Sequence, residues 1–224
     1  MNQEQWTAVD RYITELLVPA DPVLEAALQA SAAAGLPPIS VSPNEGKLLH
    51  LLARMQGARR ILEIGTLGGY STIWLARALP ADGRLVTLEV EARHAEVARA
   101  NTARAGLNGV VDLRIGRALD LLPRLAEENQ GAFDFIFIDA DKAGTADYFA
   151  WALKLSHPGS VIVVDNVVRK GEVANARSTD ASVQGIRRFN EALAAERRVS
   201  ATAIQTVGCK GYDGFALAVV MAEK

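Results

Sequence analysis

The chain has 224 residues, of which 50% are hydrophobic and 22% are charged, and its formal net charge at pH 7 is −2. This length predicts a single α/β domain, residues 1–224, and the apolar content excludes a disordered chain. No run of basic residues marks a surface for duplex nucleic acid, and the single Cys209 excludes a disulfide framework. The chain has no apolar stretch long enough to span a membrane and no secretion signal, which predicts a cytoplasmic protein that binds no membrane.

The first 57 residues carry helical patterns and precede the first buried strand. Apolar and alanine-rich positions at helical spacing predict helices at 6–17, about 21–34 and 43–55. Ser42 is a preferred N-cap for the third helix, Pro43 suits its first position, and Glu45 completes a capping box. These residues can be explained as the start of a helix and nothing more. We expect an N-terminal helical appendage, residues 1–57, on a core at 58–224.

A glycine turn is the centre of the sequence pattern. An apolar run at 61–64 is followed by Gly65, Gly68 and Gly69 and then by helical spacing, which predicts a strand, a tight turn and a helix. At such a corner bare backbone can approach a ligand closely. The dinucleotide fingerprint Gly-x-Gly-x-x-Gly is absent, and the carboxylate of Glu63 precedes the turn. An acid here suits a cationic ligand such as S-adenosylmethionine better than a pyrophosphate, although an ordinary turn with a solvated Glu63 gives the same pattern.

Short apolar strands alternate with helices along the rest of the chain. Strands are predicted at 84–89, 110–115, 133–138, 160–164, 200–206 and 215–220, and helices at 71–79, 93–105, 119–128, 143–155 and 182–195. The first five strands are continuous apolar runs, so we expect them to be buried on both faces. The pattern predicts an α/β, Rossmann-like, doubly wound and mostly parallel seven-stranded sheet, with the last two strands as an antiparallel hairpin at one edge.

Acidic side chains stand at the predicted carboxyl ends of the strands, where ligands bind in such sheets. Glu89 ends the second strand and can accept hydrogen bonds from the ribose hydroxyls of an adenosine ligand. Asp139 follows the fourth strand, and Asp165 and Asn166 follow the fifth, its expected neighbour. These oxygen ligands suit Mg²⁺, Mn²⁺ or Ca²⁺, although an Asp in such a position also serves as a helix N-cap. Lys142 is close enough to act as a general base; alternatively, it is a solvated lysine in a first helical turn.

Five motifs together resemble one known family. They are Val41-Ser-Pro-x-x-Gly46, Leu62-Glu-Ile-Gly-Thr-x-x-Gly-Tyr-Ser71, Phe135-Ile-Phe-Ile-Asp-Ala-Asp-Lys142, Asp165-Asn-Val167 and Phe189-Asn190. In this combination the chain resembles the bacterial type of the metal-dependent class I S-adenosylmethionine-dependent O-methyltransferases, the family that includes catechol and caffeoyl-coenzyme-A enzymes. The similarity extends from Ile39 to Val220. It is weakest at 167–171 and 207–214, which would line the acceptor pocket.

This resemblance implies roles for particular residues. It implies contact with S-adenosylmethionine for Val41, Glu63, Gly65, Thr66, Ser71, Glu89, Ala118 and Asp139. It implies a divalent metal held by Asp139, Asp165 and Asn166. In the catalytic centre it implies Lys142 as the base, together with Asp139. The implied reaction is methyl transfer to a hydroxyl of a small catechol-like acceptor, whose two vicinal oxygens the metal takes up.

Other functions and partners stay open on the residues alone. Methylation of a hydroxylated tRNA nucleoside uses the same chemistry, but the negative net charge disfavours a nucleic-acid partner. The missing dinucleotide fingerprint disfavours a nicotinamide-dependent dehydrogenase, and the retained metal ligands disfavour a non-catalytic binding module. Apolar residues of the N-terminal helices predict a homodimer that covers them. These residues are Trp6, Ile13, Leu16, Leu24 and Leu28.

Overall fold

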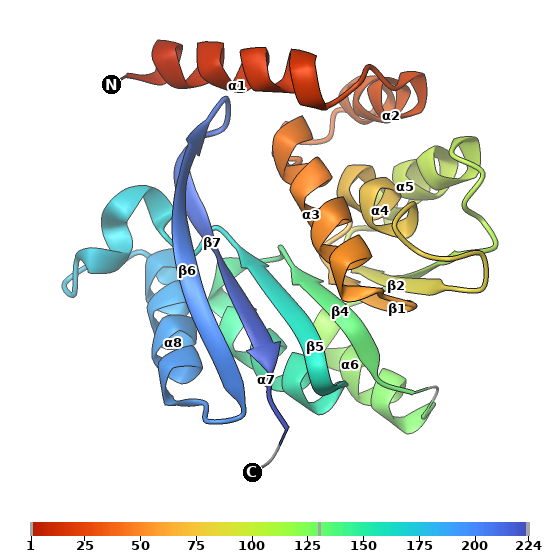
Figure 1. Cartoon of the computed structure of the whole chain (residues 1–224). Coiled ribbons are helices and arrows are strands. Elements are labelled where there is room, and N and C mark those ends of the chain that lie inside the picture. The colour runs from red at the N-terminus through yellow and green to blue at the C-terminus, as the bar shows by residue number, and fades with distance from the viewer. Residues whose placement is uncertain (1, 130, 223–224) are drawn as a thin grey trace.

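The computed structural model describes residues 2–129 and 131–222 (Figure 1). Three helices come first: α1 Gln3–Leu17, α2 Pro22–Ala33 and α3 Pro43–Gln56. The side chain of Asp21 accepts two backbone N–H groups in the first turn of α2. At the start of α3, Ser42 Oγ accepts the N–H of Glu45 at 3.2 Å. The predicted N-cap Ser42 is therefore confirmed, and the reciprocal bond from Glu45 stays a prediction.

Seven strands form one sheet in the order β3-β2-β1-β4-β5-β7-β6. The strands are β1 Arg60–Ile64, β2 Arg84–Glu89, β3 Val111–Ile115, β4 Phe133–Ile138, β5 Ser156–Asp165, β6 Val199–Gly208 and β7 Gly211–Val220. The first five pair in parallel, and β7 is antiparallel to both of its neighbours. The predicted mostly parallel sheet with an antiparallel edge hairpin is confirmed.

Three strands are longer than the sequence pattern predicts. β5 begins at Ser156, because this residue pairs with Phe133 across a register shift and Gly159 adopts a φ of +95° between the two segments. The hairpin strands reach Gly208 and start again at Gly211, where the glycines predict a longer loop. Ladder hydrogen bonds to a neighbouring strand outweigh the poor strand propensity of glycine at these positions.

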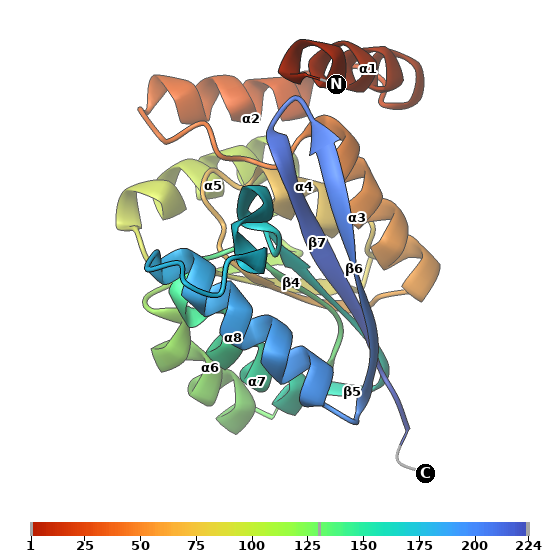
Figure 2. The same ribbon diagram turned by 90° about the vertical axis from the view of Figure 1, so that its left-hand side faces the viewer.

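The remaining helices cover both faces of the sheet. They are α4 Tyr70–Ala76, α5 Ala92–Arg104, α6 Ala118–Glu127, α7 Thr145–Lys154 and α8 Ala181–Ala195, with short 3-10 segments η1 Lys142–Gly144 and η2 Arg169–Ala174. Alternate residues of β4 face opposite layers: Ile136 and Ile138 pack with α6, α7 and α8, whereas Phe135 and Phe137 pack with α3 and α4. Figure 2 shows these two helical layers on either side of the sheet. The doubly wound architecture is therefore confirmed.

Helix α1 is joined to the tip of the β6–β7 hairpin, which reaches up to it in Figure 1. Gln3 Nε2 donates a hydrogen bond to the carbonyl of Gly208 at 2.9 Å, and the N–H of Cys209 donates to Asp10 Oδ2 at 2.9 Å. The Asn44 side chain, in the first turn of α3, donates to the same Asp10 carboxylate. Helix α1, the tip of the β6–β7 hairpin and the start of α3 thus meet at one carboxylate, that of Asp10. The division into an appendage and a core at residue 57 stays a prediction.

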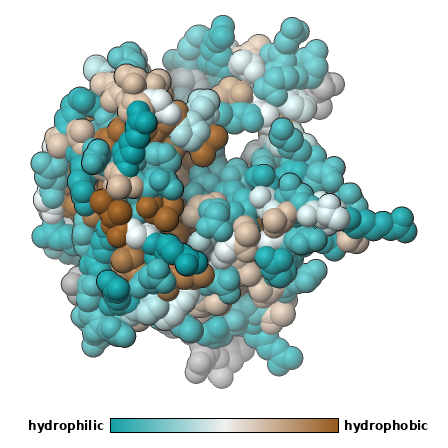
Figure 3. All heavy atoms as spheres, turned by 180° about the vertical axis from the view of Figure 1, so that it is seen from behind, coloured by the Kyte–Doolittle hydropathy of each residue, from teal (hydrophilic) through white to brown (hydrophobic). Residues whose placement is uncertain are grey.

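Large apolar side chains remain exposed on α1. Val9, Tyr12, Leu16 and Leu17 are 52%, 64%, 63% and 66% exposed. The expectation of an exposed Leu24 is wrong, because this side chain packs into the core cluster and is only 4% exposed. Seen from behind, apolar residues gather in one region, and polar residues cover most of the remaining surface (Figure 3). In the part of the chain that the structure describes, no helix is both long and apolar enough to span a membrane.

Candidate active site

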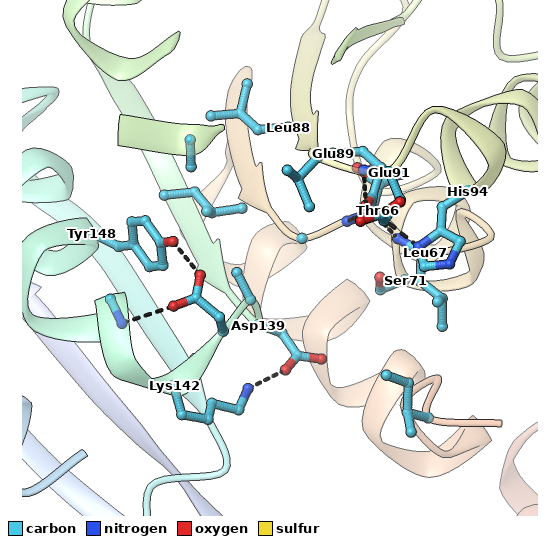
Figure 4. Close-up of a pocket in the computed structure, with 18 of the residues that line it drawn as sticks. Thr66, Leu67, Ser71, Leu88, Glu89, Glu91, His94, Asp139, Lys142 and Tyr148 are labelled. Atoms are coloured by element: carbon cyan, nitrogen blue, oxygen red, sulfur yellow. Dashed lines mark hydrogen bonds and ion pairs between the residues drawn. The ribbon is translucent and has the colours of Figure 1, made fainter. Parts of the chain in front are cut away.

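A cavity of about 880 Å³ opens at the carboxyl ends of β1, β2 and β4, a size typical of small-molecule sites. The predicted site residues that line it are Val41, Gly65, Thr66, Ser71, Glu89, Ala118, Asp139, Lys142 and Asn166. In Figure 4, Glu89 lies on one side of the cavity, and Asp139 and Lys142 lie on the other. The sheet therefore brings together most of the residues that the sequence analysis selects. The two others, Glu63 and Asp165, lie beneath its wall: Glu63 is fully buried and Asp165 is 7% exposed.

The glycine turn after β1 forms part of the cavity wall. Gly65 has a φ of +101°, and a Cβ there would lie 2.2 Å from the carbonyl oxygen of Asp139. Gly69 has a φ of +80°, and a Cβ there would lie 3.3 Å from Ala98 of α5. Glycine therefore allows β1 and β4 to end side by side and the turn to pack against a helix. Between these glycines, Leu67 takes the left-handed conformation with a φ of +50°.

Glu89 fixes this turn from the end of β2. Its Oε2 accepts the N–H groups of Thr66 at 3.2 Å and Leu67 at 2.7 Å, and its Oε1 accepts the N–H of Glu91 at 2.9 Å. The Nδ1 atom of His94 lies 3.4 Å from the same Oε1 (Figure 4). The carboxylate thus holds the turn and faces the cavity at the same time.

Glu63 lies beneath the turn and is fully buried. Its carboxylate accepts hydrogen bonds from the hydroxyls of Ser71 at 2.7 Å, Thr72 at 2.5 Å and Thr87 at 2.7 Å. Burial disfavours the charged form more strongly than these hydroxyls favour it, and it raises the pKa of Glu63 to about 7. Among the described residues Glu63 is not part of the cavity lining, so its contact with a cofactor stays a prediction.

Lys142 and Asp139 form an ion pair on the opposite side of the cavity. Lys142 Nζ donates to Asp139 Oδ1 at 2.6 Å, and the two side chains are 12% and 23% exposed. Lys142 begins η1, which Asp141 caps by accepting the N–H of Gly144 at 2.9 Å. The hydroxyl of Tyr148 donates to the other oxygen of Asp141; burial together with this bond raises the pKa of Tyr148. The cap and the ion pair hold the ammonium at the cavity wall.

Asp165 and Asn166 follow β5 beside this pair. Asp165 is 7% exposed, and its Oδ1 accepts the N–H of Asn166 at 2.6 Å. Burial, with the nearby charges of Asp139 and Glu45, raises the pKa of Asp165 well above its ordinary value. Burial and the charge of Asp139 raise the pKa of the partly buried Glu45, and Lys142 opposes this rise. Asp165 and Glu45 thus add two acids near Asp139, which is the one of the three that lines the cavity.

This donor set fits a hard divalent cation. Carboxylate and amide oxygens are the ligands that Mg²⁺, Mn²⁺ and Ca²⁺ prefer, and the crowding of acids favours a cation among them. No three described side chains of the His, Cys, Asp and Glu types form a group that could hold a metal. A site built on Asp139 and Asp165 therefore depends on the amide oxygen of Asn166.

Three residues of this site do not follow from the sequence analysis. The capping pattern alone explains Glu45 in the sequence, and only its place in the Ser-Pro-x-x-Gly motif could have drawn attention to it. Tyr148 and Arg169 both line the cavity. Tyr148 lies within an apolar helical pattern and gives no sequence signal. Arg169 lies in the segment that departs from the family pattern, which was its only signal.

Comparisons with known proteins agree with this geometry. A family model described as O-methyltransferase matches residues 15–219. A catechol O-methyltransferase from Niastella koreensis is 56% identical over 220 residues, which cover 98% of this chain and 100% of the relative. The crystal structure of an O-methyltransferase from Bacillus cereus in complex with SAH has a TM-score of 0.97 and 61% identity, and it covers 98% of this chain and 100% of its own. A second crystal structure is that of the O-methyltransferase TomG from Streptomyces achromogenes, involved in tomaymycin synthesis, in complex with SAM. It has a TM-score of 0.96 and 56% identity, and it covers 99% of this chain and 100% of its own. The resemblance seen in the motifs is confirmed, and the chain belongs to the O-methyltransferase family.

Proposed function

We propose that this protein transfers a methyl group from S-adenosylmethionine to a hydroxyl of a small catechol-like acceptor, with the help of a divalent cation. The observation that carries the proposal is one cavity with Glu89 on one side and the Asp139–Lys142 pair on the other. Methyl transfer needs the donor and the nucleophile held together in this way. The relatives support the proposed methyl donor and the proposed acceptor. Two related structures contain SAH or SAM, and the Niastella koreensis relative is a catechol O-methyltransferase.

We assign the cofactor to the side of the cavity at the glycine turn. The lining residues assigned to it are Val41, Gly65, Thr66, Ser71, Glu89, Ala118 and Asp139. Three backbone N–H groups already bind the Glu89 carboxylate. Because a carboxylate has about four acceptor positions, we expect one strong hydrogen bond from a ribose hydroxyl. Glu63 would act from beneath, since it accepts the hydroxyl of the cavity-lining Ser71 and brings a carboxylate near a cationic amino group.

We assign the cation to Asp139, Asp165 and Asn166, with Mg²⁺ as the first choice and Mn²⁺ or Ca²⁺ as alternatives. When bound, such a cation supplies positive charge that favours the deprotonated form of a vicinal diol. The charges of Asp139 and Glu45 near the buried Asp165 support this assignment, because a cation would offset their mutual repulsion.

We assign the general base to Lys142. Its Nζ lies 2.6 Å from Asp139 Oδ1, and this bond orients the amine at the cavity wall. In its neutral form the amine would accept the proton of the acceptor hydroxyl. The oxygen would then form a bond to the methyl carbon while the bond from that carbon to the cofactor sulfur breaks. The protein contributes mainly orientation and exclusion of water.

Methyl transfer from labelled S-adenosylmethionine tests this function. Catechol should be methylated in the presence of Mg²⁺, EDTA should abolish the reaction, and an excess of Mg²⁺ or Mn²⁺ should restore it. Undermethylated tRNA, assayed in parallel, should not be labelled. Asp165→Ala should lose activity even at high metal concentration, whereas calorimetric titration should show that S-adenosylmethionine binding largely survives. Full activity in EDTA would overturn the role of the cation. Labelling of tRNA, with no labelling of catechol in the parallel assay, would overturn the acceptor class.

We further propose a homodimer that covers part of α1. The support is the row of exposed apolar side chains, Val9, Tyr12, Leu16 and Leu17, on a helix held to the rest of the molecule through polar contacts at its inner side. Multi-angle light scattering at micromolar concentration should report two copies, and Leu16→Glu should shift the population toward one copy. A wild-type monomer under these conditions would contradict the proposal.

A further inference from the structure

Arg169, three residues after Asn166, is one of the cationic residues that line the cavity. Its side chain lines the same cavity as Asn166 and Lys142. The Nε atom is buried and has no hydrogen-bond partner among the described residues. Nη1 lies 3.9 Å from Asp213 Oδ2, which is too far for a hydrogen bond. A guanidinium whose Nε lacks a partner can bind a further ligand, because a buried donor without a partner is unfavourable.

The backbone holds Arg169 in this position at the expense of strain. Arg169 has a φ of +52° and Lys170 a φ of +56°, so two consecutive non-glycine residues adopt the left-handed conformation. Asp213 stabilises the bend, since its Oδ1 accepts the N–H groups of Val168 at 3.0 Å and Arg169 at 2.9 Å. Strained backbone of this kind persists where the surrounding structure enforces it, and it concentrates at functional sites.

The described acids near Arg169 make no hydrogen bond to its guanidinium, and Asp213 forms only a long ion pair with it. Asp213 accepts two backbone N–H groups, Asp139 pairs with Lys142, and Asp141 accepts the hydroxyl of Tyr148 and the N–H of Gly144. Within the described residues none of these acids is hydrogen-bonded to the guanidinium. Among the residues that the structure describes, the guanidinium is therefore paired only with Asp213, at 3.9 Å, and its N–H donors can still bind a ligand on the acceptor side of the cavity.

We propose that Arg169 binds a carboxylate carried by the acceptor, so that the preferred substrates are catechols with a carboxylate on the ring or on a short side chain. The planar guanidinium matches a carboxylate through paired N–H donors, and such charge-assisted bonds are among the strongest in proteins. This inference rests on the proposed methyl transfer to a vicinal diol and names the substrate class within it. Arg169 selects the acceptor and orients its ring. Lys142 and the proposed cation site at Asp139, Asp165 and Asn166 act on the acceptor hydroxyls.

The test compares two acceptors that differ only in this charge, 3,4-dihydroxybenzoate and its methyl ester. Wild-type protein should give a higher kcat/KM for the acid. In Arg169→Gln the ratio of acid to ester should fall at least about tenfold, mainly through the KM of the acid. Lys170→Gln is the matched control, since it removes the same charge from an exposed neighbour that also has a positive φ and does not line the cavity. This control should change the ratio by less than about twofold.

Two further measurements keep the outcomes distinct. Arg169→Lys keeps the charge and loses the paired donors, so it should retain part of the preference for the acid. Titration calorimetry of the acid and the ester into each variant repeats the comparison without turnover. A ratio that Arg169→Gln leaves unchanged, or that Lys170→Gln lowers equally, would overturn the role of Arg169. Wild-type protein that binds the acid more tightly in an Arg169-dependent way, yet methylates neither acceptor, would overturn the proposed function and leave the carboxylate site in place.

Discussion

Replacing Glu63 by glutamine should change the pH dependence of stability. Glu63 is fully buried, and its pKa in the folded protein is raised from 4.5 to about 7. Between these two values the unfolded chain is ionised while the folded protein still holds the proton. The folded state binds more protons in this window, so the free energy of unfolding falls as the pH rises.

The expected loss follows from the size of the shift. At about 1.4 kcal/mol per pKa unit, a rise from 4.5 to about 7 corresponds to roughly 3 kcal/mol between pH 4.5 and pH 7. Glutamine carries no charge and does not undergo this loss. Its amide oxygen can accept the hydroxyls of Thr72 and Thr87, and the hydroxyl of Ser71 can turn to accept the amide N–H. Any cost of this rearrangement is independent of pH.

Urea unfolding of the wild type and Glu63→Gln at half-unit steps from pH 4.5 to pH 8 measures the effect. The difference in unfolding free energy should move in favour of Glu63→Gln by about 3 kcal/mol over this range, because all other titrating groups contribute equally to both proteins. A difference that stays constant within about 0.5 kcal/mol, or that moves in favour of the wild type, would show that Glu63 is already ionised in the folded protein.

Three other substitutions test the remaining parts of the site. Glu89→Ala should weaken S-adenosylmethionine binding at least about tenfold in calorimetric titration, because the ribose acceptor and the anchor of the glycine turn are lost together, and unchanged affinity would remove Glu89 from the site. Lys142→Ala should lose about 10²–10⁴-fold in kcat, bind the cofactor normally and recover partly at high pH, where the acceptor ionises without a base; wild-type turnover at neutral pH would refute the assignment. Gly65→Ala should lower the melting temperature by roughly 10 °C, because its Cβ would lie 2.2 Å from the carbonyl oxygen of Asp139 at a φ of +101°, and a melting temperature within a few degrees of wild type would contradict that reasoning.

Much of the site could be predicted because its residues stand at fixed places relative to secondary structure. Glu89, Asp139 and Asp165 end or follow strands β2, β4 and β5, and the carboxyl ends of parallel strands lie at one edge of a sheet. Gly65 marks a turn that no larger residue could form. The sequence pattern is less informative for the hairpin. The glycines at 208, 211 and 214 have low strand propensity, but the hydrogen-bond ladder between β6 and β7 holds them in strands.

The order of the elements and the edge of the sheet that binds ligands are determined by the sequence itself. Short apolar runs between helical patterns specify buried parallel strands, and right-handed crossovers between them leave few alternatives. The protonation of Glu63 and the direction of Arg169 are decided only by the tertiary structure. The pKa of Glu63 depends on the complete exclusion of water, and one of its partners, Thr87, comes from a neighbouring strand. Arg169 faces the cavity because Asp213, from a strand added at the end of the chain, holds its backbone in a strained bend. The spacing of residues along the sequence carries no information about solvent exclusion or about contacts between distant segments. Solvent exclusion and such contacts determine the chemistry of a buried charge.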